Sequence, residues 1–171
     1  MTGVPDGFEP NADELVAHND AFAASFPSAH LGPEPSRRLA IVACMDARLD
    51  VPALLGIDVG EAHIIRNAGG VITDEVIVSL CLSQRVLGTR EIVLVHHTDC
   101  GLEHVVEAEF LQALEAETGV RPPWTLRSFD DPAADVLRSI ELLESSPFLL
   151  HTDHIRGFVY DVADGRLHEP G

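Results

Sequence analysis

Short apolar runs alternate with longer amphipathic segments along most of this chain. Two of the runs, RLAIVAC (38–44) and REIVLVHH (90–97), are apolar almost throughout and are bounded by polar residues, and EAHIIRNAGG (61–70) contains a third run that ends in a glycine turn. Strands that are apolar on both faces are typical of a parallel sheet that helices cover on both sides. These runs therefore predict buried, parallel strands.

The segments between and after these strands carry the signals of helices. Residues 73–88 begin with a threonine N-cap and stop at a glycine, and residues 131–145 begin with an aspartate cap followed by proline. A further helix is predicted at 102–119, and residues 155–169 predict a strand, a turn and a short return strand. This alternation predicts an α/β fold: a mostly parallel, open sheet of four to five strands flanked by helices.

Residues 1–36 differ from the rest of the chain. Four apolar side chains recur at roughly helical spacing in the segment 11–26: Leu15, Val16, Phe22 and Phe26. The segment 27–36 is rich in proline, glycine and serine. We therefore predict an N-terminal helical arm and linker over residues 1–36, which packs on a partner subunit, and a single α/β domain over residues 37–171.

The charge balance argues against two classes of partner. Aspartate and glutamate number 28 against 11 basic residues, and the formal net charge is −17. Such a charge repels phosphate backbones and anionic membranes, so neither a nucleic acid nor a membrane is expected as a partner. No apolar run reaches the roughly 20 residues of a spanning helix, and the first residues do not resemble a secretory signal, so we expect a cytoplasmic protein.

Chemically reactive side chains follow each of the three strands. CMDAR (44–48), RNAGG (66–70) and HHTDCG (96–101) come at the ends of the first, second and third strand. Ligands of open α/β sheets bind just beyond the carboxyl ends of the strands. The three segments are therefore expected to converge on one crevice.

Two cysteines and one histidine of these segments form a candidate metal site. Zinc takes thiolate and imidazole ligands, and Cys44, His97 and Cys100 would supply three. His97 is preferred over His96, because neighbouring residues of a strand point to opposite faces. A cysteine nucleophile with His97 as its base is the alternative, but it does not explain why two cysteines flank the crevice. Cys81, which lies between leucines on a predicted helix, is expected to be a core residue.

Asp46 and Arg48 lie just after Cys44 and are expected to pair. Arginine offers a carboxylate two parallel hydrogen bonds, which fix its direction and keep it ionised. Beside zinc, such a carboxylate can accept the hydrogen bond of a bound water. If it were released from Arg48, Asp46 could instead fill the fourth position of the metal, and the chain would then be a non-enzymatic, zinc-binding regulatory protein.

Taken together, the three segments resemble the signature of the β-class carbonic anhydrases. In that family Cys-x-Asp-x-Arg is followed by His-x-x-Cys, and the same elements stand here in the same order, over most of the chain from about residue 36. The resemblance implies one zinc ion per chain on Cys44, His97 and Cys100. It implies a catalytic dyad of Asp46 and Arg48. It also implies a substrate pocket formed by the glycine turn after the second strand and by the glycine after Cys100. Its residues are Asn67, Ala68, Gly69, Gly70 and Gly101.

The resemblance further implies the activity. The family hydrates CO2 to bicarbonate reversibly with a zinc-bound hydroxide, as a lyase, and assembles as homodimers or dimers of dimers whose N-terminal helices reach across to the partner. The doubled histidine resembles a short branch that includes carbonyl sulfide hydrolases, so hydrolysis of carbonyl sulfide to hydrogen sulfide and CO2 is the alternative. The residue that carries the proton away is left open among His63, His96 and His104.

Overall fold

The computed structural model describes residues 10–171, so residues 1–9 of the predicted arm lie outside the described part. The chain divides into two compact units, one ending at Leu31 and the other spanning Gly32–Gly171, and the division falls within the predicted linker 27–36. The first unit contains helix α1 (Ala12–Ala23), which has no buried residue. The packing of this arm on a partner subunit stays a prediction.

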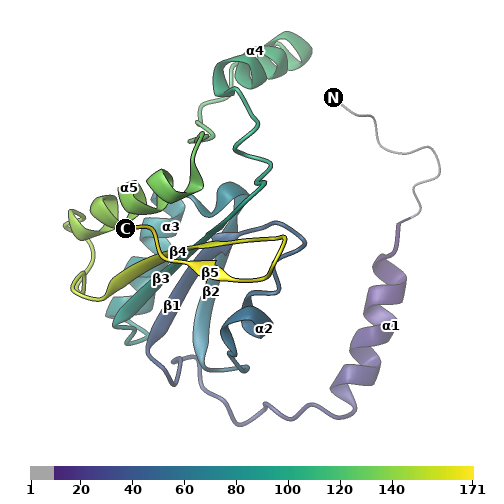
Figure 1. The fold of residues 1–171 in the computed structure, drawn as a ribbon. Coiled ribbons are helices and arrows are strands. Elements are labelled where there is room, and N and C mark those ends of the chain that lie inside the picture. The colour runs from purple at the N-terminus through teal and green to yellow at the C-terminus, as the bar shows by residue number, and fades with distance from the viewer. Residues whose placement is uncertain (1–9) are drawn as a thin grey trace. The chain divides into compact units, whose positions relative to one another are not determined.

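The second unit is built on one five-stranded sheet with the strand order β2-β1-β3-β4-β5 (Figure 1). The strands are β1 (Leu39–Cys44), β2 (Ala62–Asn67), β3 (Glu91–His97), β4 (Ile155–Tyr160) and β5 (Leu167–His168). The first four pair in parallel, and β5 pairs antiparallel to β4. The predicted fold class, a mostly parallel sheet flanked by helices, is confirmed.

The helices of this unit are α2 (Val51–Leu55), α3 (Asp74–Arg85), α4 (Glu107–Thr118) and α5 (Pro132–Glu144). Helices α2, α3 and α5 pack on the sheet beside two apolar clusters, whereas α4 has no buried residue and projects away from the sheet (Figure 1). Side chains of α3 and α5 form one cluster with alternate residues of β1 and β3, such as Val42 and Leu94. The other alternate residues, such as Ile41 and Val95, form the second cluster with the start of α2. No helix among residues 10–171 is both long and apolar enough to cross a membrane.

The helix boundaries agree with the predicted caps in two cases and differ in a third. The Thr73 hydroxyl accepts a hydrogen bond from the Val76 backbone N–H at 3.4 Å at the start of α3, and the Asp131 carboxylate accepts one from Ala133 at 2.9 Å at the start of α5. The predicted start of the third helix at residue 102 is wrong, because α4 begins at Glu107. The residues before it form turns, and Leu102 is buried there rather than placed on a helix.

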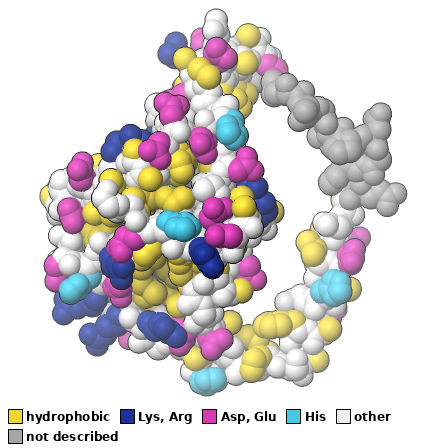
Figure 2. Space-filling model, in the orientation of Figure 1, with side chains coloured by type: hydrophobic (Ala, Val, Ile, Leu, Met, Phe, Trp, Pro, Cys, Tyr) yellow, Lys and Arg dark blue, Asp and Glu magenta, His cyan; other side chains and the backbone are white. Residues whose placement is uncertain are grey.

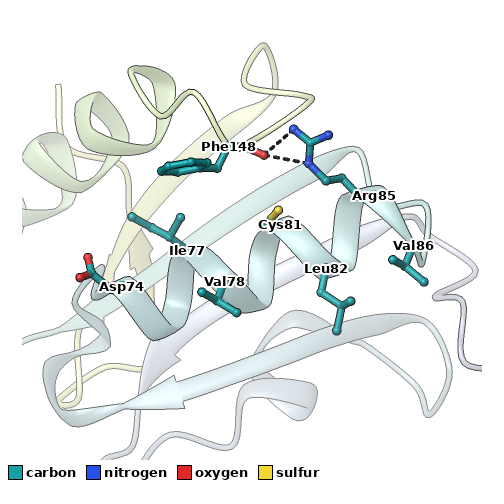
Figure 3. Close-up of a pocket in the computed structure, with 8 residues that line it drawn as sticks. All are labelled: Asp74, Ile77, Val78, Cys81, Leu82, Arg85, Val86 and Phe148. Atoms are coloured by element: carbon teal, nitrogen blue, oxygen red, sulfur yellow. Dashed lines mark hydrogen bonds between the residues drawn. The ribbon is translucent and has the colours of Figure 1, made fainter.

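Cys81 lies on α3 at the margin of the core, where it is partly buried and packs against an apolar cluster. Its side chain is half-buried in an apolar groove with Ile77, Val78 and Leu82 (Figure 3). Its environment is apolar, as the sequence predicts, but its full burial is not confirmed. Cys81 is remote from the strand ends, so it is a suitable control for changes at the other two cysteines.

Gly157 on β4 allows α5 to approach the sheet closely. A methyl group at this position would come within 2.2 Å of the Val136 Cγ1 atom and within 3.3 Å of the Ile140 Cδ1 atom. We expect Gly157→Ala to lower the free energy of unfolding by about 1–3 kcal/mol, because overpacking forces side chains out of their rotamers. Urea denaturation measures this change, with Gly32→Ala as the control, since a methyl group at Gly32 would meet no atom within 4 Å. Equal stabilities of the two variants would contradict the packing argument.

Candidate metal centre

The three predicted metal ligands come together beyond the carboxyl ends of β1 and β3. Cys44 and His97 are the last residues of these two paired strands, and Cys100 follows in a turn that contains Asp99 at a φ of 54°. The two sulfur atoms lie 3.9 Å apart, and the ligand atoms of all three residues lie within 4.8 Å of one another. All three side chains are buried. The fold therefore builds a group that could hold a metal ion.

His97 presents a nitrogen without a partner to this group. Its Nδ1 lies 2.9 Å from the backbone oxygen of Thr98, so Nδ1 carries the proton and Nε2 carries the lone pair. Nε2 is buried and has no hydrogen-bond partner within residues 10–171. A buried polar atom without a partner is costly, and a metal ion that accepts its lone pair removes that cost. The position of His97 thus fits a metal ligand.

The two sulfur atoms fit the same ion. Both cysteines are free, and their separation is far above the roughly 2.05 Å of a disulfide. Two sulfurs bound at about 2.3 Å to a tetrahedral zinc would lie roughly 3.8 Å apart. A hydrogen bond from Cys100 lowers the pKa of Cys44 even though burial acts in the opposite direction, and the same contact raises the pKa of Cys100. The contact between the two sulfurs therefore favours a thiolate at Cys44, which is the form in which a cysteine binds a metal.

Asp46 is held beside this group by Arg48. One carboxylate oxygen of Asp46 accepts hydrogen bonds from the Arg48 backbone N–H and Nε–H, each at 2.9 Å, and the other accepts one from Nη2 at 2.8 Å. The oxygen that accepts the bond from Nη2 lies 3.8 Å from the Nε2 atom of His97. These bonds from Arg48 hold the pKa of Asp46 well below its usual range, so the carboxylate is ionised at neutral pH.

Two residues that the sequence analysis did not single out complete this arrangement. Asp99 accepts a hydrogen bond from Arg48 Nη1 at 2.8 Å on its carboxylate and one from Nη2 at 2.8 Å on its backbone oxygen. Arg66 donates to the backbone oxygens of Cys44 and Asp46 at 2.9 and 2.8 Å. Asp99 and Arg66 lie in the motifs HHTDCG and RNAGG, which the sequence pointed to as part of the site. Their individual hydrogen bonds could not be predicted, because these bonds depend on how the segments meet in space.

The glycine turn after β2 packs directly on the end of β1. Gly69 and Gly70 have φ angles of 78° and 71°, in the left-handed region that favours glycine. A methyl group on Gly70 would come within 2.9 Å of the Cys44 backbone nitrogen, and one on Gly69 within 2.5 Å of a Leu102 methyl group. These glycines therefore allow the turn to lie against the strand that positions Cys44.

Comparison with known proteins identifies the family. A family model described as carbonic anhydrase matches residues 39–124. The protein named beta-carbonic anhydrase 1 of Mycobacterium tuberculosis is 52% identical over 157 residues, which cover 92% of this chain and 96% of the relative. This chain belongs to the β-carbonic anhydrase family.

Two further comparisons extend the family relationship. A carbon disulfide hydrolase of Acidianus is 33% identical over 159 residues, which cover 79% of this chain and 78% of the relative. The crystal structure of a carbonic anhydrase from Streptococcus mutans superposes with a TM-score of 0.88 at 41% identity, and the match covers 96% of this chain and 99% of that one. The family thus includes relatives that are named for two different substrates.

In this carbonic anhydrase family member, an apolar pocket of about 290 Å³ opens beside the candidate metal ligands. Its lining includes three of the predicted pocket residues, Ala68, Gly69 and Gly101. The other two lie outside the lining: the Asn67 side chain donates to the backbone oxygen of Val71 at 2.8 Å, and Gly70 packs on β1. Apolar side chains that no sequence motif indicated complete the lining: Met45, Leu102, Val105, Phe110 and Leu126.

His96 points away from the ligand group, as the alternation of strand residues predicts. Its side chain is fully buried, its Nε2 lies 2.8 Å from the Asp135 carboxylate of α5, and its ring lies beside Phe129. Burial raises the pKa of Asp135, but the contacts with His96 and Arg138 outweigh this and lower it overall. His96 therefore ties the end of β3 to α5, and His97 is left as the histidine of the metal group.

Proposed function

We propose that this chain is a zinc-dependent carbonic anhydrase that hydrates CO2 reversibly to bicarbonate, with one zinc ion per chain on Cys44, His97 and Cys100. The observation that carries this proposal is the buried Cys2His group with its unpartnered Nε2, set beside an apolar pocket. Zinc bound there would lower the pKa of a water molecule so that a nucleophile forms near neutral pH. The 52% identical relative is a carbonic anhydrase by name, which supports the same activity.

The chain's own residues would bind the substrate and orient the water. CO2 is linear and has no net dipole, so it suits the apolar side chains of the pocket better than a charged ion does. The carboxylate of Asp46 would accept a hydrogen bond from the attacking water and turn a lone pair of its oxygen toward the carbon. Arg48 fixes the direction of this carboxylate and keeps it ionised. Because both oxygens of Asp46 are engaged by Arg48, the structure favours this role over closure of the metal site by Asp46.

Hydration converts CO2 and water into bicarbonate and a proton, which must leave the site. Asp46 cannot keep the proton, because its pKa is held below the usual range of a carboxylate. Of the three histidines considered, His63 is engaged by Ser83 and by the Pro33 backbone oxygen, and His96 is fully buried. His104 is exposed, and its Nε2 lies 3.5 Å from the Asp99 carboxylate that contacts Arg48. We infer that His104 passes the proton to solvent.

We expect His104→Ala to lower kcat at least about tenfold in a weakly buffering medium, because transfer of the proton then limits turnover. The ratio kcat/KM for CO2 should stay unchanged, since binding and attack do not involve this side chain. Stopped-flow hydration with and without added imidazole buffer measures the effect, and imidazole should restore kcat. His154→Ala, which changes an exposed histidine paired with Asp153, is the control. A kcat that imidazole does not restore would exclude the proposed role.

Hydrolysis of carbonyl sulfide to hydrogen sulfide and CO2 is the second candidate. Carbonyl sulfide is also linear, the pocket is apolar, and carbon disulfide hydrolases are among the relatives. Comparison of kcat/KM for CO2 and for carbonyl sulfide on the same zinc-loaded preparation separates the two activities. We expect the value for CO2 to be the larger. A larger value for carbonyl sulfide would make the chain a hydrolase.

The N-terminal arm bears on how the protein assembles. We propose that the chain forms a homodimer or a dimer of dimers, that residues 1–36 are an arm which packs on the partner, and that the protein is cytoplasmic. The apolar side chains exposed on α1, among them Leu15, Val16 and Phe22, support a partner for the arm, because water does not favour such a face. Sedimentation of the full chain and of Phe22→Ser tests this: the change should weaken the dimer.

A further inference from the structure

The arginines of this chain are unevenly paired. All 11 basic residues are arginines, and they face 28 acidic residues. Seven of the arginines form ion pairs with carboxylates. The four without such a partner among residues 10–171 are Arg38, Arg66, Arg85 and Arg90. Arg66 binds backbone oxygens near the metal group, and the other three line a single cavity of about 460 Å³.

This cavity lies at the amino ends of β1 and β3, opposite the end that carries the metal group. Arg38 directly precedes β1 and Arg90 directly precedes β3, and the backbone N–H groups of Arg90 and Glu91 both donate to the Arg38 oxygen, at 2.7 and 3.2 Å. Two cationic residues therefore stand side by side on neighbouring strands, where like charges repel one another. Basic side chains also gather at the lower left of the space-filling view, near these strand ends (Figure 2).

A buried glutamine and Arg85 fix the far wall of the cavity. The Oε1 atom of Gln84 accepts hydrogen bonds from the backbone N–H groups of Leu150 and His151 at 2.8 and 3.1 Å, and its Nε2 donates to the His151 oxygen at 2.8 Å. Arg85 donates to the Phe148 oxygen through Nε and Nη2 (Figure 3). The loop 148–151 is thereby tied to the end of α3. It places a ring nitrogen of His151 within 2.8 Å of Arg90 Nη1.

One carboxylate, that of Glu34, also lines the cavity, and no ion pair joins it to the three arginines. None of the three arginines that line this cavity has a carboxylate partner among residues 10–171, so no ion pair neutralises their charge. A guanidinium group presents a planar fork of donors that matches the oxygens of phosphate, and it stays charged at all relevant pH values. A single carboxylate would be satisfied by one such fork, whereas a tetrahedral phosphate group can use several.

We propose that this cavity is a binding site for a phosphate group, either as inorganic phosphate or as the terminal monoester of a small molecule. Its volume suits a small ligand, and the net charge of −17 disfavours the phosphate backbone of a nucleic acid. The site is separate from the metal group, at the other end of the same strands. The proposal therefore does not depend on the hydration activity.

The test is a titration of the isotope-labelled full chain with inorganic phosphate, followed by backbone amide NMR at constant ionic strength. We expect saturable shifts at Thr89, Arg90 and His151. The double variant Arg38→Gln, Arg90→Gln should weaken binding at least about tenfold, because charge-assisted hydrogen bonds are lost. The control variant Arg121→Gln removes an exposed arginine elsewhere and should bind as the wild type does.

A second variant tests the sign of the charge effect without removing an arginine. Glu34→Gln should bind phosphate more tightly than the wild type, since it removes the one negative charge at the cavity. The same titration with glycerol phosphate distinguishes the sources: equal affinity indicates the free ion, and higher affinity indicates a small phosphomonoester. The proposal is overturned if no amide shift saturates, if the shifts occur only around Cys44 and Gly101, or if Arg121→Gln weakens binding as much as the double variant does.

Discussion

The Cys100→Ser variant should lose its zinc and its activity together. We expect bound zinc to fall from about one per chain to a small fraction, because a serine hydroxyl is a poor substitute for one of three thiolate and imidazole ligands. CO2 hydration should then fall to the rate measured without enzyme. Elemental analysis and stopped-flow hydration on the same preparation measure both quantities.

The control for this change is Cys81→Ser on α3, at the margin of the core. Cys81 is half-buried in an apolar groove and belongs to no metal group among the described residues. This variant should keep both its zinc and its activity. If Cys100→Ser kept full zinc and full hydration, the ligand assignment would be wrong. If both cysteine variants lost activity to the same extent, the loss would reflect the fold and not the metal.

The Asp46→Asn variant should keep its zinc but lose most of its activity. Asparagine has the same shape as aspartate, but it lacks the charge that Arg48 holds in place and that the attacking water would bind. We expect kcat/KM for CO2 to fall by about 10²–10⁴, which is the usual contribution of a positioned acid or base. Stopped-flow hydration at pH 8 beside a zinc determination measures the change. Asp74→Asn, which alters a highly exposed carboxylate, is the control and should leave hydration unchanged.

The pH dependence gives a separate check on Asp46. Its folded pKa is depressed by Arg48, so its contribution to stability is present above the ordinary aspartate pKa of about 3.9 and is lost as the pH falls below that value. Asp46 is therefore ionised throughout the range between pH 6 and 9. Any rise of wild-type activity in that range must report another group. A wild-type profile that followed the protonation of Asp46 near neutral pH would contradict the pairing.

The strands and the ligand group could be predicted because their signals are local in the sequence. An apolar run such as 39–44 has few alternatives to a buried strand, and the observed strand ends at the cysteine, as expected. The alternation of strand residues distinguished His97 from His96. Convergence of the three reactive segments followed from the general rule for the carboxyl ends of parallel strands.

The features that could not be predicted depend on contacts between distant segments. The left-handed turn at Asp99 and its contact with Arg48 follow from the meeting of two strand ends. The buried pair of His96 and Asp135 follows from the packing of α5 on β3. The five-residue helix α2 is too short to show a periodic pattern, and the late start of α4 follows from the packing of Leu102 beside Gly69.

The most direct test of the central claim is CO2 hydration by the full chain before zinc removal, after removal with a chelator and after return of one equivalent. We expect hydration to disappear with the metal, to return with it, and to scale with the zinc content at about one ion per chain. The thiols of Cys44 and Cys100 must stay reduced in all three samples. Fast hydration by the metal-free chain would contradict the zinc-dependent activity, and a zinc-loaded chain that hydrates no CO2 would exclude CO2 as the substrate.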